Sequence, residues 1–411
     1  MLVFATGPLL AQPPAVPQSD TSAETQKETR SNKESTEKSA IPTPTGAQFR
    51  TSDQGFGFGQ LDPDPTSLFG PNRTPVVLPD NGSLSTIGAT AYFSHQFAPN
   101  QRLLLESLVD PTDFGFDASY AISHSDSGDI FTGNLFFNDG RYQSTEFGSR
   151  TLGLSSPKGA FAHYRQMGGG LEYTHNFDNQ LWLASAINYR RTTVEDRLLG
   201  GRVTPFDELG NPLTLNPSGI DQTLSLEISG LYSSLDDLQF PTQGTKLRFG
   251  AEQLFPIGAT QMTSTRLRLN WTQFIPLELI TFDEGPAYLI LNAQAGTALG
   301  DLAPYDAYNL GGLNSVRGWN PGELATGRTF AQFTGEYRFP VGSPEFFGEQ
   351  VLLRGTVFVD YGTDFDSANT VWGQPGIARG KPGHGWGVGL GIQAVSPIGL
   401  ARLETGLNLA G

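Results

Sequence analysis

The chain has 411 residues, with 41 acidic and 26 basic side chains and a formal net charge of −15. This balance argues against a nucleic-acid partner, which needs a basic patch, and fits poorly with general binding to anionic lipid headgroups. The sequence contains no run of about 20 apolar residues and no cysteine, which excludes a membrane-spanning helix, disulfides and thiolate metal sites.

Two segments precede the first strand pattern. Residues 1–12 resemble the end of a secretory signal with a small-residue cleavage site near Ala11, although the basic n-region is missing. An ordinary flexible N-terminus is the alternative. Residues 13–80 are rich in Pro, Ser, Thr, Glu and Lys, and Ala23 is the only apolar residue between positions 21 and 39. We expect a disordered linker here, because so little apolar surface cannot offset the entropy lost on ordering.

Residues 81–411 consist of strand patterns separated by turns, and residues 197–220, with their Gly, Pro and Asn, indicate a long extracellular loop. The clearest strand is 265–275, where apolar residues alternate with Arg266, Arg268 and Asn270. An arginine on the lipid face of a barrel costs about 2–4 kcal/mol at the membrane midplane. The two arginines therefore favour an antiparallel β-barrel with a wet lumen over a two-sheet sandwich, which would need a dry interior there.

The residues that could form a functional site are concentrated between Tyr308 and Gly362. A glycine-rich loop, Leu310-Gly-Gly-Leu-Asn-Ser-Val-Arg-Gly-Trp319, precedes two strand-like runs. Because strand side chains alternate between two faces, Glu336 and Arg338 share one face of the first run. Arg354, Phe358 and Asp360 share one face of the second run in the same way. These charged faces suit a further cation such as Arg317 delivered by the loop, since an enclosed charge needs a partner.

Three motifs in this stretch resemble those of the BamA–TamA superfamily of outer-membrane barrels, also called bacterial surface antigens. They are the loop Val316-Arg-Gly-Trp319, the strand Gly335-Glu-Tyr-Arg-Phe-Pro340 and the strand Phe358-Val-Asp-Tyr-Gly362. The family's loop signature usually ends in Phe or Tyr, so Trp319 is an aromatic variant. Three motifs in this order are far more specific than a lone Val-Arg-Gly. The alternative is a soluble β-protein with a surface arginine in a turn.

The resemblance implies a site. In that family the loop folds back into the barrel, and its arginine is held by acidic residues of the next two strands. Carried over here, Arg317 pairs with Glu336 and Asp360. The lumen-loop motif then comprises Gly311, Gly312, Ser315, Val316, Arg317, Gly318 and Trp319. The strand residues expected to anchor the loop are Gly335, Glu336, Arg338, Phe358, Asp360 and Gly362.

The C-terminal part of the sequence does not decide whether the barrel closes. In residues 385–392 glycines alternate with Trp386, Val388, Leu390 and Ile392, and these glycines leave room for an inserted loop. Residues 401–410 resemble the family's penultimate strand. We expect an all-β barrel of about sixteen strands, in which either the sequence is truncated or the closing strand is missing or substituted. Most family members also carry POTRA modules, which receive client proteins, and residues 13–80 lack the periodicity of one.

The resemblance implies an outer-membrane barrel that inserts other barrels or exports polypeptides, in a bacterial outer membrane or a plastid outer envelope. The expected partners are membrane lipids, unfolded outer-membrane or exported polypeptides, and an accessory periplasmic subunit. The alternatives are a passive solute pore and a barrel that anchors a surface-interaction tail. We expect no enzyme activity, cofactor or metal, since the five histidines lack ligand spacing and no nucleophile or phosphate motif occurs.

Overall fold

The structure is a computed structural model, and it describes short segments at 2–5, 55–58 and 76–77 followed by residues 89–410. Within the second part it leaves out residues 99, 110–112, 125–128, 141–161, 178–179, 238–240, 262, 281, 313–314, 321, 347 and 397–398. The predicted signal remnant (1–12) and disordered linker (13–80) lie outside the described residues except at three short strands. These are β1 (Leu2–Ala5), β2 (Gly55–Phe58) and β3 (Val76–Val77).

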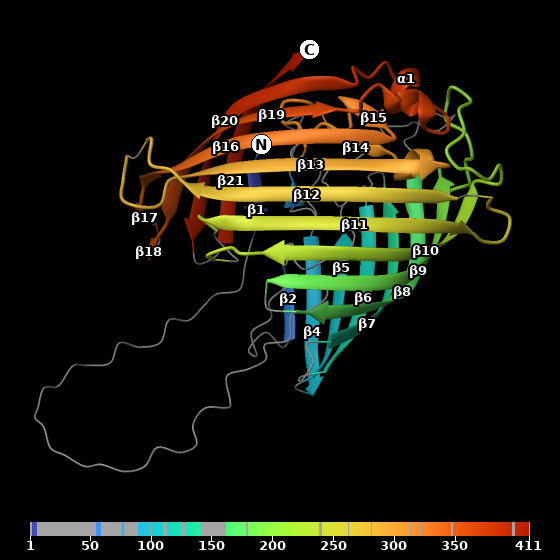
Figure 1. Ribbon diagram of the computed structural model, residues 1–411, viewed down its shortest axis with the longest axis horizontal. Helices are drawn as coiled ribbons and strands as arrows, with labels where there is room; N and C mark the ends of the chain where they lie inside the picture. The colour runs from blue at the N-terminus through green and yellow to red at the C-terminus, as the bar shows by residue number, and fades with distance from the viewer. Residues whose placement is uncertain are drawn as a thin grey trace, which may run out of the picture.

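In the part of the chain that the structure describes, seventeen strands form one antiparallel sheet (Figure 1). Fourteen of these strands are 9–15 residues long. They are β4 (Ala89–Ala98), β5 (Gln101–Val109), β6 (Asp113–His124), β7 (Asp129–Gly140), β8 (His163–Asn176), β9 (Leu181–Glu195), β10 (Ile220–Ser233), β11 (Gly244–Pro256), β12 (Ser264–Pro276), β13 (Tyr288–Gly300), β16 (Thr329–Gly342), β19 (Leu352–Thr363), β20 (His384–Ser396) and β21 (Gly399–Ala410). The prediction of an all-β antiparallel fold with about sixteen strands is confirmed.

Each long strand pairs with the next long strand along the chain, which is the simplest antiparallel topology. At one end of the series β2 pairs with β4, and at the other end β1 pairs with β21 and β3 with β1. Among the described residues β2 and β3 are not paired with each other, so the sheet is curled but not closed (Figure 1). No helix in the described part of the chain is long and apolar enough to cross a membrane.

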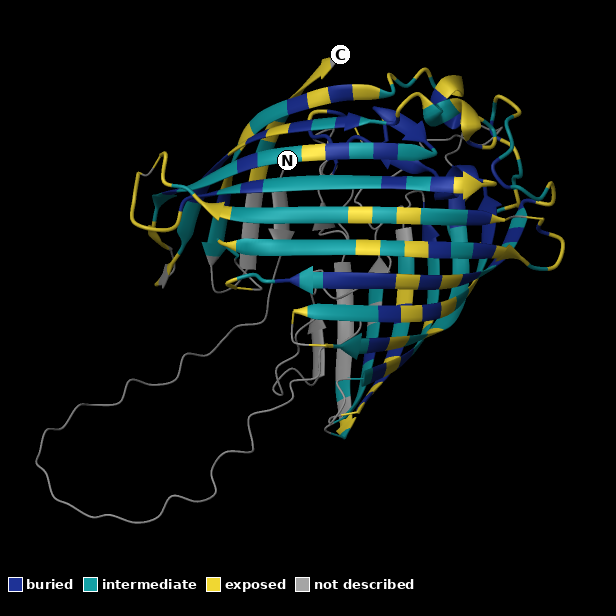
Figure 2. Cartoon of the chain, in the orientation of Figure 1, coloured by how far each residue is buried: buried dark blue, intermediate teal, exposed yellow. Residues whose placement is uncertain are grey.

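Side chains alternate between an apolar outer face and a polar inner face. Figure 2 shows the accompanying alternation of exposed and more buried residues along the strands. On β10 the outer Leu226 and Ile228 are 49% and 66% exposed, while Glu227 between them is buried. On β12 the predicted inner arginines are on the inside of the sheet: Arg266 donates to Glu252 and Arg268 to Glu227. This alternation is the pattern of a barrel whose outside faces lipid and whose lumen is polar.

Turns and loops agree with the sequence at the places where turn residues were recognised. β8 and β9 pair as a hairpin, and the expected long loop is formed by residues 196–219 between β9 and β10. Between β10 and β11, the carboxylate of Asp236 accepts hydrogen bonds from the backbone of Thr242 and Gln243 and from the Thr242 hydroxyl. These bonds lower the pKa of Asp236 to about 2 despite some burial. Asp236 therefore caps a turn.

The remaining elements are short and belong to the loops. Residues 301–328, between β13 and β16, contain η1 (Pro304–Asp306), β14 (Tyr308–Leu310) and β15 (Ala325–Gly327). Residues 364–383, between β19 and β20, contain η2 (Ser367–Thr370) and α1 (Pro375–Ala378). β17 (Glu345–Phe346) and β18 (Glu349–Gln350) make a small hairpin between β16 and β19.

Candidate functional site

The loop of residues 301–328, called here the inward loop, is folded against the inner face of the sheet. It has an apolar core of its own, to which β16 contributes one ring. This core consists of the buried side chains of Tyr308, Leu310, Val316, Trp319, Leu324, Ala325 and Phe330. β14 and β15, which pair with each other, contribute Tyr308, Leu310 and Ala325 to this core. A loop that buries this much apolar surface has a defined shape, and it can therefore hold a charged side chain at a fixed position.

Glycines with positive φ shape the tip of the inward loop. Gly311 has φ +110° and Gly318 has φ +92°, a left-handed region that side chains with a Cβ rarely adopt. Between them, the Ser315 hydroxyl accepts from the Gly311 amide at 3.2 Å and donates to Gln332 Oε1 on β16 at 2.8 Å. The motif residues Gly311, Ser315 and Gly318 thus form the turn that presents Arg317 to the sheet.

Arg317 lies between carboxylates from two neighbouring strands. Its Nε donates to Asp360 Oδ2 at 2.7 Å and its Nη2 to Asp360 Oδ1 at 2.9 Å, which makes a bidentate pair. Its Nη1 donates to Glu336 Oε2 at 2.6 Å, and its backbone amide donates to Asp360 Oδ2 at 3.0 Å. The register explains the arrangement, because Glu336 lies opposite Phe358 and Asp360 opposite Thr334, so both carboxylates share the inner face.

The environment of this pairing is nearly dry. Arg317 is 5% exposed, Glu336 4% and Asp360 0%. The ring of Phe358 covers the guanidinium, with Arg317 Cζ 3.5 Å from the ring centroid. Charges interact more strongly here than at a wet surface, and each carboxylate that lost its cation would be costly to keep ionised.

Two further strand residues of the predicted site lie at its edge. Arg338 Nε donates to Glu336 Oε1 at 2.6 Å, so Glu336 bridges Arg338 and Arg317. Gly335 faces outward beside Phe333 and Val359, away from the inward loop. Arg354 is directed to Tyr288 on β13 instead. The structure therefore brings together Arg317, Glu336, Phe358 and Asp360, with Arg338 as a neighbour.

Glycines on β19 and β20 allow the inward loop to approach the sheet closely. A Cβ on Gly387 would lie 1.8 Å from the Arg317 carbonyl oxygen, and one on Gly362 would lie 2.7 Å from Val316 Cγ2. A Cβ on Gly385 would lie 2.9 Å from the Trp319 ring. Trp319 also donates from its indole nitrogen to the carbonyl of Trp386 at 2.9 Å. The room expected from the glycine-rich strand is thus occupied by the loop.

The base of the inward loop is held by a second set of charges. The Asp306 carboxylate accepts from Arg190 Nη2 on β9 at 2.6 Å and from Arg266 Nη1 on β12 at 3.2 Å. The neighbouring Tyr305 hydroxyl donates to Asp221 Oδ2 on β10 at 2.7 Å. The loop is consequently attached at two places, its tip on β16 and β19 and its base on β9, β10 and β12.

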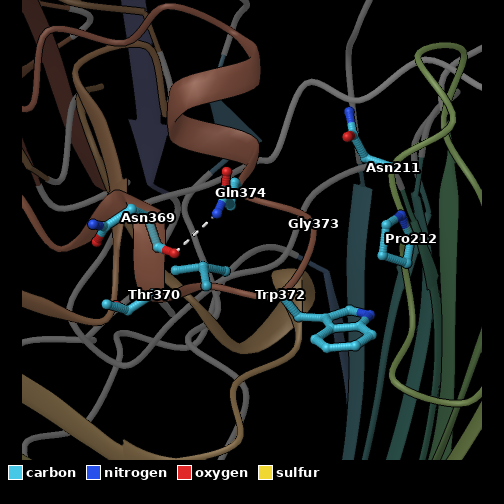
Figure 3. A pocket seen from close by; sticks show the side chains of 8 residues that line it. Asn211, Pro212, Asn369, Thr370, Trp372, Gly373 and Gln374 are labelled. Atoms are coloured by element: carbon cyan, nitrogen blue, oxygen red, sulfur yellow. Dashed lines mark hydrogen bonds between the residues drawn. The ribbon is translucent and has the colours of Figure 1, made fainter.

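At the same end of the sheet, the 364–383 loop contacts the 196–219 loop and the inward loop, the latter through a hydrogen bond from the Trp372 amide to the Leu302 carbonyl. Arg379, beside α1, donates to Asp207 at 3.2 Å and also to Glu208 in the 196–219 loop. Where these loops meet there is a hollow, lined by Asn211, Pro212 and residues 369–374 (Figure 3). All the side chains that line it are uncharged.

Stability of this loop assembly is expected to rise with pH. Lys381 donates to Thr326 Oγ1 at 2.7 Å, and burial together with the charge of Arg379 lowers the pKa of Lys381 to about 8, against the opposing effect of Glu323. Between pH 8 and the ordinary value of 10.5, the unfolded chain binds more protons than the folded one. The free energy of unfolding therefore increases with pH across this window, and below it the buried ammonium lowers stability.

Thermal unfolding in detergent across this pH range tests the expectation. The melting temperature of the wild-type protein should rise with pH relative to that of the Lys381→Gln variant, which keeps the hydrogen-bonding group but has no proton to lose. Parallel curves for the two proteins would show that Lys381 does not carry the dependence.

Several contacts of the site have no signal in the sequence. Glu404 on β21 lies within reach of Arg317, with Nη1 and Oε1 3.4 Å apart. Asp306, Arg190 and Arg266 meet only because the sheet brings three distant segments together. Within the residues that the structure describes, no group of three or more His, Asp or Glu side chains has the arrangement of a metal site.

The curled antiparallel sheet, its apolar outside and the arginine-bearing inward loop define an outer-membrane β-barrel with a loop folded into its lumen. The model of the Omp85 superfamily domain matches residues 100–410 of this chain. The chain therefore belongs to the Omp85 superfamily, and the predicted resemblance to BamA-type outer-membrane barrels is confirmed.

Curated relatives are outer envelope proteins of chloroplasts. Outer envelope protein 80 of Arabidopsis thaliana is 28% identical over 331 residues, which are 80% of this chain and 42% of that protein. Outer envelope protein 39 of Arabidopsis thaliana is 31% identical over 209 residues, about half of each chain (51% and 52%). Protein TOC75 of Pisum sativum is 30% identical over 213 residues, 50% of this chain and 24% of that protein. The chain thus spans about half or less of the relatives it matches.

Two solved structures share the fold. BamA from Haemophilus ducreyi lacking POTRA domains 1–3 superposes with a TM-score of 0.59 at 16% identity, covering 80% of this chain and 65% of that one. CdiB from Escherichia coli gives a TM-score of 0.52 at 12% identity, covering 80% of this chain and 57% of that one. At such low identity the comparison establishes the barrel fold alone.

Proposed function

We propose that this chain is the membrane part of a machine that inserts or exports unfolded polypeptides at an outer membrane. The observation that carries the proposal is the tip of the inward loop, where Arg317 is buried between Glu336 and Asp360 inside the barrel. In a machine that must stay sealed between substrates, a loop held in this way would close the path until it moves.

The open sheet supports the insertase form of this proposal. β4 and β21 are the outermost long strands, and each pairs on its outer side with only a four-residue strand in the described part of the chain. Weakly paired edges present free N–H and C=O groups, which can template an incoming strand. The proposed partners are accordingly outer-membrane lipids, unfolded polypeptides and an accessory periplasmic subunit. Because the relatives are chloroplastic, a plastid outer envelope is proposed beside a bacterial outer membrane.

A passive solute pore is the second candidate, and the charged lumen favours it. Arg190, Arg266 and Glu252 lie on the inner face, where water and ions would pass. In this case the inward loop would only stabilise the barrel and narrow the channel, and no polypeptide would be handled.

Insertion of a client barrel into liposomes tests the proposal. The refolded chain is reconstituted, an unfolded test barrel is added, and the appearance of protease-protected client is compared with that in empty liposomes. Acceleration is the expected result. Single-channel conductance is recorded on the same preparation.

The two readouts separate the candidates. Stable conductance without accelerated insertion would contradict the proposed insertase and support the passive solute pore. Liposomes carrying the Arg202→Ala variant, which changes an exposed arginine in the 196–219 loop, should behave like wild type and provide the matched control.

A further inference from the structure

The turn of residues 277–287, between β12 and β13, exposes large apolar side chains. Leu279 and Phe282 are each 71% exposed, and Ile280 is 42% exposed. These three side chains are called here the turn patch. Figure 2 shows the turn at the left rim of the sheet, where it is drawn as exposed. Large apolar side chains that gather in this way on a surface mark an interaction site.

The turn is folded back over the outer face of the sheet. The Tyr337 hydroxyl on β16 accepts from the amide of Leu279 at 2.8 Å and from the amide of Ile280 at 2.9 Å. Tyr337 lies between Glu336 and Arg338, whose side chains meet on the inside of the barrel. Because strand side chains alternate, Tyr337 faces outward, and the turn that is bound to it lies on the outside of the wall.

Aromatic rings extend this attachment along the outer wall. The ring centroid of Phe282 lies 5.8 Å from that of Phe339, and Phe339 stacks on Tyr337 at 5.7 Å. The Phe339 ring also covers Gly355 on β19, where a Cβ would lie 2.5 Å from it. Aromatic rings are thus gathered at this rim, as they are where the outside of a barrel meets the boundary between acyl chains and headgroups.

The backbone of the turn is hydrogen-bonded within the protein. Besides the two amides that bind Tyr337, the Leu277 amide donates to the Ala287 carbonyl at 3.0 Å, and the Phe282 amide donates to the Pro340 carbonyl at 3.2 Å. An unpaired backbone amide is costly where water is scarce, and these bonds remove that cost for four amides of the turn. The apolar part of the turn can therefore enter a membrane boundary.

The charged residues of the turn are all acidic. Glu278, Asp283 and Glu284 are exposed, and residues 277–287 contain no lysine or arginine. Anionic headgroups attract basic side chains and repel carboxylates. The turn therefore suits a membrane surface whose headgroups are neutral or zwitterionic.

We propose that the turn of residues 277–287 is a membrane-surface anchor, which places the turn patch in the boundary between headgroups and acyl chains of a neutral or zwitterionic bilayer. Tyr337 is the positioning residue that holds the turn against the outer wall. The patch is continuous with the lipid-facing wall through Phe339, so a bilayer fits it better than a protein does. The inference does not depend on whether the chain handles polypeptides, because lipid contact is measured without a client.

Quenching by nitroxide-labelled lipid is the first test. The chain has no cysteine, so Leu279→Cys provides a unique site for a fluorescent label in the full chain. The protein is reconstituted in phosphatidylcholine liposomes that contain lipid with a nitroxide near the headgroup. Interfacial segments lie about 5–10 Å into the boundary, so the label at residue 279 should be quenched several-fold more strongly than one at Asp237→Cys. Asp237 is the matched control, because it is exposed in the β10–β11 turn at the same end of the sheet.

The headgroup preference is tested by replacing part of the phosphatidylcholine with phosphatidylglycerol. Quenching at residue 279 should fall at low ionic strength and recover when salt screens the charges. Equal quenching in the two membranes would overturn the preference.

Tyr337→Phe tests the positioning role, since it keeps the ring and removes the oxygen that binds two amides of the turn. In hydrogen exchange, the amides of Leu279 and Ile280 should exchange about fivefold faster than in wild type, as expected from the loss of modest hydrogen bonds. Quenching of the label at residue 279 should fall as well. Tyr361→Phe, the same change on the outer face of β19, should alter neither readout.

Equal quenching at residues 279 and 237 would overturn the inference and would favour a protein partner for the turn patch. Wild-type exchange and quenching in Tyr337→Phe would overturn the role of Tyr337. A chain that inserts no client would contradict the proposed function, and the lipid contact of the turn would still be decided by quenching.

Discussion

The Arg317→Ala variant is expected to lose about 3–5 kcal/mol of folding free energy, the cost of leaving a buried charge without its partner. Asp360 and Glu336 would both remain in the nearly dry site while the cation that they share is removed. The tip of the inward loop should come off β16 and β19. A heat-modifiability gel, in which the folded barrel migrates faster than the unfolded chain, should show less folded protein, and urea unfolding in detergent gives the size of the loss.

Two further variants distinguish the causes of this loss. Arg317→Lys keeps the charge but has no planar fork to span both oxygens of Asp360, so it should recover only part of the stability. Arg202→Ala removes an exposed arginine and should change stability by less than about 0.5 kcal/mol. A gel on which Arg317→Ala is folded like wild type at normal abundance would contradict the role assigned to this arginine.

The Gly387→Val variant is expected to displace the inward loop while leaving all its charged groups in place. A Cβ at this position would lie 1.8 Å from the Arg317 carbonyl oxygen, and a backbone atom has no rotamer through which to move aside. Overpacking a tight contact costs about 1–3 kcal/mol. The loop should become sensitive to limited proteolysis, and the fluorescence of Trp319, now nearly buried against β20, should shift toward that of a solvated indole.

Gly250→Ala on β11 is the matched control. The added Cβ would meet no atom closer than Ser229 Cβ at 3.5 Å, an ordinary contact. Replacing glycine inside a strand also removes an entropic penalty of about 0.5–1 kcal/mol, so this variant should be as stable as wild type or slightly more stable. Equal protease resistance of the loop in Gly387→Val and Gly250→Ala would show that the close approach at Gly387 does not hold the loop.

Much of the architecture was predictable because the alternation of inward and outward side chains along each strand is visible in the sequence. The alternation around Arg266 and Arg268 predicts an inner face, and both side chains pair with carboxylates there. Parity likewise placed Glu336 and Asp360 on inner faces. The sign pattern of these strands suggested Arg317 as a partner, and the family resemblance supplied the particular pairs, since alternation alone does not reveal which loop enters the barrel. The functional role of this site remains a prediction.

Other parts depend on register, which the sequence does not specify. Glu404 lies in a strand whose alternation is ordinary, and its closeness to Arg317 depends on how β20 and β21 align. Asp306 receives its arginines from β9 and β12, two strands that no local pattern connects to it. The 364–383 loop, with η2 and α1, also lacked a strong signal, because its helices are a single turn each.

The carboxylates around Arg317 lie far ahead of it along the chain. Glu336 is 19 residues away, Asp360 43 and Glu404 87. Neighbouring strands can pair as soon as each hairpin exists, but contacts between distant residues form slowly because a long segment must be ordered first. Docking of the arginine is therefore a late event in folding. Until β21 is in place the loop lacks one of its contacts, so a fully docked Arg317 marks a barrel in which β16, β19 and β21 have assembled.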